Sequence, residues 1–358
     1  MDKNLNYAKM PMDFKLNRKK VIELSGGNLM NTFRKILLVI FLLSSGLFST
    51  VAQADITSEE ELNKFVTHYY QNPQPNQIPQ AVKYFISSAE FKRYMQTNQH
   101  LVEMLAYFFG RVAELSPKLR RDYEKMYDKA DEKSKVFFWK IFSVYRDPTT
   151  EKFFKAKMNA DPTQKVVLQN MLNQPLKGKQ FFVKDVQGLN QLDFLWMEFF
   201  ATGSREPIQK IIDVLNWKDI FRNKLQDWLL TSHTQEDKDR LSQLSRNDLK
   251  VNVEVDRARI NYFGDMDCLY FSFIRTSSFH QPAKVGIEFK QILGLSDKDF
   301  VYIITKGAAF LGLLSNAQKH PKVLEFCNQE LKSRKDKSNA ELQNIVNAAG
   351  TAKKRIRL

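Results

Sequence analysis

The feature that most constrains this fold is a succession of short apolar patterns with helical spacing, separated by prolines, glycines and capping residues. Within residues 62–70, apolar side chains recur every three or four positions, as on one face of a helix. Ser58 and Glu61 precede that stretch with the spacing of a capping box, and Pro79 occupies a first-turn position of the next pattern. We therefore expect a mainly α protein in which short helices follow one another closely.

Residues 249–290 depart from this helical spacing. Val251, Val253 and Val255 alternate with polar residues, and a similar alternation follows the turn-like sequence around Gly264. A period of two is typical of β-strands. We expect a small β-hairpin or sheet here, packed on the helices, because an isolated hairpin is only marginally stable in water.

The expected domain covers residues 55–348, with the β insertion at 249–290. Short helices joined by turns with proline or glycine predict irregular helical hairpins, arranged either as an α-solenoid-like stack or as an orthogonal bundle. No strict repeat period is visible in the sequence. The hairpins are therefore not predicted to be tetratricopeptide repeats.

Residues 30–54 have the organisation of a secretory signal peptide. A basic start precedes an uninterrupted apolar run of eight residues at 36–43, and Ala52 and Ala54 supply the small side chains of an A-x-A cleavage site. We expect cleavage after Ala54 and export to the periplasm or the extracellular space. The competing interpretation is membrane retention by an uncleaved leader, although the apolar run is shorter than the roughly 20 residues of a stable span.

Residues 1–29 fit this scheme poorly. They are polar and basic, whereas a signal peptide rarely carries such a preface. Met30 stands directly before the basic start of the leader. We therefore interpret Met30 as the translation start and residues 1–29 as an incorrectly assigned or unstructured extension.

The net charge of +15 at pH 7 raises the question of a nucleic-acid partner. Without residues 1–54, the chain holds 47 basic and 37 acidic side chains, a net charge of +10. Four of these basic residues lie in 353–357, and the other charges of both signs are interleaved. We therefore expect no nucleic-acid partner. The tail at 349–358 is expected to be disordered, with weak contact to anionic surfaces, and the leader to contact the membrane transiently.

A long motif occupies residues 192–203, with the sequence Leu-Asp-Phe-Leu-Trp-Met-Glu-Phe-Phe-Ala-Thr-Gly. It resembles the Leu-Asp-x-Leu-Trp-x-x-Phe-Phe-Ala-Thr-Gly core of a family of uncharacterised bacterial secreted helical proteins, and Phe194 departs from the commonest spelling. Two further stretches are similar to that family. They are Tyr-Tyr-Gln-Asn-Pro-Gln-Pro at 69–75, with Ile-Pro-Gln-Ala at 78–81, and Leu-Ser-Asn-Ala-Gln-Lys-His-Pro-Lys-Val at 314–323. The resemblance implies a helical exported protein and carries no established activity.

The residues of this motif favour an architectural interpretation. Trp196, Phe199 and Phe200 are expected to fill a core, next to Asp193 in the same motif. Gly203 is expected to end the helix in the left-handed conformation and to allow a close turn to the next helix.

The chain contains no strong signal for a metal site or a cofactor. None of its five histidines is paired with His, Cys or Glu at a metal-ligand spacing. His68 lies in an aromatic-rich helical pattern, where we expect a structural histidine. Cys268 and Cys327 are the two cysteines, and export would permit a disulfide between them, although sequence does not establish their distance. We expect neither a metal nor a cofactor.

Two functional hypotheses follow from these observations. The first is a non-enzymatic exported helical protein that binds a protein or peptide partner, as a binding or scaffold module. The alternative is an envelope or extracellular hydrolase with an unrecognised site near residues 256–280, where Asp256, Asp265, Asp267 and His280 would have to converge. The catalytic residues of such an enzyme are unknown from the sequence, and we favour the first hypothesis.

Overall fold

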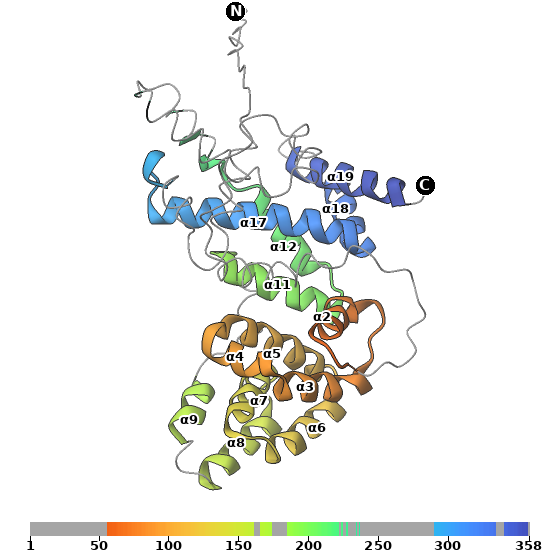
Figure 1. Ribbon diagram of the computed structural model, residues 1–358, viewed down its shortest axis with the longest axis vertical. Coiled ribbons are helices and arrows are strands. Elements are labelled where there is room, and N and C mark those ends of the chain that lie inside the picture. Colours follow the sequence, from red (N-terminus) through yellow and green to blue (C-terminus); the bar gives the residue numbers. More distant parts are fainter. Residues whose placement is uncertain are drawn as a thin grey trace, which may run out of the picture. The chain divides into compact units, whose positions relative to one another are not determined.

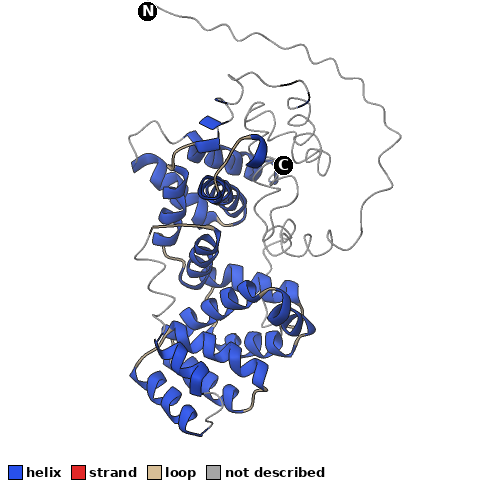
Figure 2. Cartoon of the chain, turned by 90° about the vertical axis from the view of Figure 1, so that its left-hand side faces the viewer, coloured by secondary structure: helices blue, strands red, loops and turns tan. Residues whose placement is uncertain are grey.

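Every secondary-structure element in the described part of the chain is a helix (Figures 1 and 2). The computed structural model describes residues 56–160, 165–173, 185–221, 290–333 and 340–356, together with a few single positions between 223 and 236. The helices are α2 (Glu59–His68), η1 (Tyr69–Gln71), η2 (Pro75–Gln77), α3 (Ile78–Ser87), α4 (Ala89–Thr97), α5 (Gln99–Glu114), α6 (Pro117–Asp128), α7 (Glu132–Val144), α8 (Pro148–Ala160), α9 (Lys165–Asn173), α11 (Leu189–Thr202), α12 (Glu206–Leu215), α17 (Asp297–Lys319), α18 (Pro321–Ser333) and α19 (Ala340–Ile356). The predicted mainly α class is therefore confirmed.

Two predicted segments fall largely outside these ranges. The leader at 30–54 lies entirely outside them, as does the preface at 1–29. The predicted β-hairpin lies outside them too, apart from its last residue, Lys290, which begins a short helical turn that closes with the Leu295 N–H bonded to the Lys290 carbonyl at 2.9 Å. The leader and the hairpin stay predictions.

The helix starts follow the local signals in the sequence. The Ser58 hydroxyl accepts the Glu61 N–H at 3.2 Å, and the Glu61 carboxylate accepts the Ser58 N–H at 3.0 Å, so the predicted capping box begins α2. Ser296 and Asp299 form the same arrangement at the start of α17. Pro79 lies in the first turn of α3. These side chains satisfy backbone donors that the first turn of a helix leaves without partners.

Helices α5 and α7 pack unusually closely. A Cβ atom placed on Gly110 of α5 would lie 2.6 Å from Val144 Cβ and 2.8 Å from the Ile141 carbonyl oxygen of α7. Glycine is therefore the residue that allows this approach. Helix α7 is buried on most sides, as its apolar sequence predicts, and its Trp139 stacks on Phe154 of α8 with ring centroids 4.7 Å apart.

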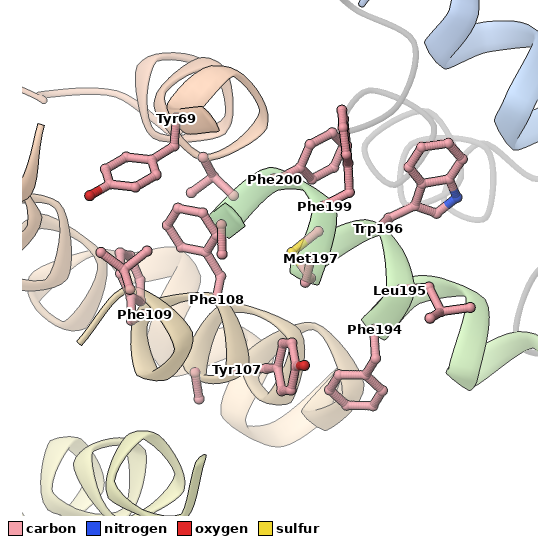
Figure 3. Close-up of a cluster of buried hydrophobic side chains, with 14 of the residues drawn as sticks. Tyr69, Tyr107, Phe108, Phe109, Phe194, Leu195, Trp196, Met197, Phe199 and Phe200 are labelled. Atoms are coloured by element: carbon pink, nitrogen blue, oxygen red, sulfur yellow. The ribbon is translucent and has the colours of Figure 1, made fainter. Parts of the chain in front are cut away.

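Helix α11 carries the long sequence motif and is buried on opposite faces. Figure 3 shows Phe194 pointing toward Tyr107 of α5, whereas Trp196 points to the other side of the helix. The Phe194 and Tyr107 ring centroids are 5.2 Å apart. On the other side, a Cβ atom on Gly312 of α17 would lie only 3.1 Å from Trp196 Nε1. Because α11 packs against both α5 and α17, almost its whole circumference is apolar.

Helix α17 packs against α12, α18 and α19. Among the described residues, it is the one helix that is long and apolar enough to cross a membrane, with a mean hydropathy of 1.4 over its most apolar stretch. Two thirds of that stretch is buried inside the protein, and the buried Lys306 lies in its middle. These properties are typical of a core helix.

Helix α19 is longer than the sequence analysis predicts. The tail at 349–358, expected to be disordered, is helical as far as Ile356. Leu342 and Ala349 are buried and attach the helix to the core. The alanine, lysine and arginine residues that follow are strong helix formers, and basic residues near a helix C-terminus interact favourably with the helix dipole.

Candidate functional site

Segments that are far apart in the sequence meet at one place, which we call the motif junction. It consists of His68–Gln71, the end of α11 at 199–203, and Lys319–Lys322, where α17 gives way to α18. The Tyr70 ring packs on Phe199 with centroids 4.5 Å apart, and the Tyr70 hydroxyl lies 3.1 Å from His320 Nδ1. Residues from the stretches at 69–75, 192–203 and 314–323 therefore contact one another here.

Gly203 closes α11 at the motif junction. Its φ of 65° is left-handed, and its N–H donates to the Phe199 carbonyl at 2.7 Å, so it ends the helix in the predicted conformation. A Cβ atom on this glycine would lie 3.1 Å from Tyr70 Cβ and 3.1 Å from Lys322 Nζ. Gly203 thus provides both the backbone conformation and the space that the other two segments occupy.

Two histidine rings face each other within the junction. The His68 and His320 ring centroids are 4.8 Å apart, and His320 is 1% exposed. Burial lowers the pKa of His320 to about 3, with additional repulsion from His68 and Lys319. Burial also lowers the pKa of His68. Both imidazoles are therefore neutral at pH 7.

A buried ion pair connects α11 to α5. Both oxygens of the Glu198 carboxylate bind Arg111, with Oε2 2.6 Å from Nε and Oε1 2.7 Å from Nη2, and the Tyr107 hydroxyl donates to Oε2 at 2.9 Å. Glu198 is 5% exposed. Burial, together with the adjacent carboxylate, raises the pKa of the Tyr107 hydroxyl. The two-pronged geometry compensates for the cost of removing the charges from water.

Further polar contacts join parts of the chain that are distant in the sequence. Asp193 of the motif lies 2.7 Å from His100 Nε2 of α5. The Lys306 ammonium of α17 donates to the Trp217 carbonyl at 2.9 Å and lies 3.1 Å from Glu341 of α19. Glu330 of α18, a further buried carboxylate, accepts from Arg205 and Gln209 around the start of α12. Each contact joins residues on different parts of the chain.

The structure places the predicted motif residues as follows. Phe199 and Phe200 are buried within the motif junction at the end of α11, and Trp196 is buried against α17. Asp193 is partly exposed beside His100. Sequence analysis missed Glu198, which stands at an unspecified position of the motif, although an acidic residue on an otherwise apolar helix indicates a paired buried charge.

The remaining predicted residues lie in part outside the described ranges. These are Ala52 and Ala54 of the cleavage site and the four residues of the alternative hydrolase site, Asp256, Asp265, Asp267 and His280. Cys268 is outside them as well, so its pairing with Cys327 stays a prediction. Cys327 itself is buried on α18, and burial raises the pKa of its thiol to about 12. A reduced Cys327 is thus a weak nucleophile.

The polar groups in the described part of the chain are arranged to connect helices. Within those residues, no three His, Cys, Asp or Glu side chains are close enough to hold a metal ion. The fold and the motif junction therefore define a class of protein: helical, with polar contacts between helices that are distant in the sequence. Comparison of the chain with protein-family models, characterised proteins and solved structures finds no match.

Proposed function

We propose that this protein is an exported helical binding or scaffold module for a protein or peptide partner, in the periplasm or the extracellular space. The observation that carries the proposal is that many of the described helices pack on their neighbours in sequence. Consecutive helices such as α3 and α4 pack together, and α5 packs on both α6 and α7. Stacks of this kind present continuous surfaces and are widely used to bind other proteins.

This pattern favours irregular helical hairpins over a bundle with a single centre. Helices α17 and α19 pack together with α18 between them in sequence, as α5 and α7 do with α6. Helix α11 interrupts the stack, because it packs on α5 rather than on the helices that directly precede it. We infer an irregular α-solenoid-like arrangement around α11.

The resemblance to the family of secreted helical proteins is part of this proposal. Its three stretches contact one another at the motif junction, although Tyr70 and His320 are 250 positions apart. A motif whose separate parts meet in space is typical of a structural unit that is shared as a whole. We infer that the chain belongs to this family and is exported through the leader at 30–54.

Photo-crosslinking tests the binding proposal at defined surface positions. Large apolar side chains are exposed at Leu115, Val166 and Val301. A photoreactive residue would replace each one in turn, and the protein would be irradiated in envelope extracts of the producing cells. A reactive residue at the exposed Lys83 of α3 is the control position.

We expect one partner to be captured reproducibly from at least one of the three positions, and excess unmodified protein to abolish the capture. The purified partner should then bind the chain and lose at least about ten-fold in affinity, or about 1.4 kcal/mol, when that position is changed to Asp. Two outcomes would contradict the proposal. One is equal capture from all positions, the control position included, and the other is capture that excess unmodified protein does not reduce. Turnover of an envelope substrate that a single substitution abolishes would establish the hydrolase alternative instead.

A further inference from the structure

Hydrogen-bond partners favour one arrangement of protons in the neutral histidine pair at the motif junction. His68 Nδ1 lies 3.1 Å from the Lys64 carbonyl and 3.0 Å from the Thr67 hydroxyl. The Thr67 hydroxyl donates to the Asn63 carbonyl at 2.8 Å, so a proton on His68 Nδ1 satisfies the Lys64 carbonyl. The Gln71 amide donates to the Tyr70 hydroxyl at 3.0 Å, which leaves the hydroxyl proton free to reach His320 Nδ1. In the neutral state both rings therefore have satisfied Nδ1 atoms.

A proton added to His320 meets an unfavourable environment on each side. On the N-terminal side lie the His68 ring and the Tyr70 hydroxyl, and the charge of Lys64 acts on His68. On the C-terminal side lie the charges of Lys319 and of Lys322, whose Nζ is 5.9 Å from the Tyr70 ring centroid. Helix α11 contributes the rings of Phe199 and Phe200, with centroids 6.5 and 5.6 Å from that of His320.

Protonation also breaks the hydrogen bond between the Tyr70 hydroxyl and His320 Nδ1. A charged imidazolium donates from both nitrogens, so His320 Nδ1 can no longer accept the Tyr70 proton. The hydroxyl would have to accept from His320 and from Gln71 and to donate its own proton elsewhere. Since His320 is almost fully buried, hydration of the new charge requires the segments around it to separate.

We propose that the motif junction is a pH-sensitive contact, which opens at mildly acidic pH and releases α2 and η1 from α11 and the α17–α18 turn. The closed junction holds neutral rings, so it binds fewer protons than the open one. Its stability is complete above pH 6.5, the ordinary value for an exposed histidine, and declines as the pH falls from 6.5 toward 3. At pH 5 the equilibrium constant for opening should be about 30-fold higher than at neutral pH.

Hydrogen–deuterium exchange of the full chain tests this at pH 7 and pH 5, after correction for the intrinsic pH dependence of exchange. We expect protection of the α2–η1 amides to fall by about 30-fold, while the amides of α5 and α7 keep theirs. His320→Gln removes the more deeply buried titrating ring and should greatly reduce the difference between the two pH values, leaving the smaller contribution of His68. His100→Gln, at a histidine outside the junction, is the matched control and should leave it intact.

His68→Gln is the second variant and is used if His320→Gln does not fold. Because the His68 ring is partly exposed, its replacement should destabilise the fold less. This change removes one repelling group, and the acid effect should become smaller. A uniform loss of protection along the whole chain at pH 5 would overturn the proposal. An undiminished acid effect in both junction variants would overturn it as well.

Discussion

At Gly203 a single residue carries two separate constraints. Its backbone is left-handed, which costs other L-residues about 1–2 kcal/mol, and its missing side chain leaves room for Tyr70. Gly294 is also left-handed, with φ of 57°, but a Cβ atom there would contact nothing within 4 Å. Comparison of Gly203 with Gly294 therefore separates the energetic cost of a left-handed backbone from the cost of steric overlap with neighbouring side chains.

We predict that Gly203→Ala lowers the free energy of unfolding by more than Gly294→Ala does. Both substitutions pay for the left-handed backbone, about 1–2 kcal/mol, but alanine at 203 must also displace Tyr70 and Lys322. Urea unfolding of the two variants gives the comparison. Equal losses would mean that the neighbouring side chains adjust freely.

The sequence predicts the end of α11 at Gly203, because a glycine after an apolar helical pattern is a local signal. It does not predict the contact of Tyr70 with His320, since no local pattern relates residues 250 positions apart. Glu198 is an intermediate case. Its place on an apolar helix face indicates a buried pair, but only the structure identifies Arg111 as the partner.

Between elements, the spacing of α5 and α7 depends on one missing side chain. We predict that Gly110→Ala destabilises the protein by about 1–3 kcal/mol or more, because its Cβ would overlap Val144 and the Ile141 carbonyl. Thermal unfolding, followed by circular dichroism, measures the change.

Gly350 provides the matched control in α19, where a Cβ atom would meet nothing within 4 Å. Gly350→Ala should stabilise the protein by up to about 1 kcal/mol, because alanine is the better helix former. The same chemical change should thus have opposite effects in the two helices. A stabilising Gly110→Ala would show that α5 and α7 separate without cost.

Helix starts were the most predictable elements, because capping side chains act on the turn beside them, as at Ser58 and Ser296. The prediction of a disordered tail at 349–358 is wrong, because α19 continues to Ile356 and packs on α17, which no local pattern indicates. The pairs of helices that pack together likewise cannot be predicted from local sequence patterns. Neither neighbour of α11 follows from its sequence, although its all-round apolar character indicates that it has more than one.

At the scale of the whole molecule, cleavage of the leader after Ala54 and export stay predictions of the sequence, since residues 1–55 lie outside the described ranges. We predict that mass spectrometry of the exported protein gives Asp55 as its first residue.

Substitution at the cleavage site tests the same prediction. Ala54→Phe should block processing and leave a larger, membrane-associated precursor, because the peptidase needs a small residue there. Gln53→Phe, at the intervening position, should be processed normally. An uncleaved wild-type protein would support membrane retention instead.

The contact between Tyr70 and His320 also has a consequence for the time course of folding. During synthesis, Tyr70 leaves the ribosome 250 residues before its partner. At about 5–20 residues per second, that interval is roughly 12–50 s. Throughout it, η1 and the end of α2 lack their contacts with His320 at the turn between α17 and α18. In the nascent chain, the packing of η1 and the end of α2 therefore cannot be completed until the turn between α17 and α18 has been synthesised.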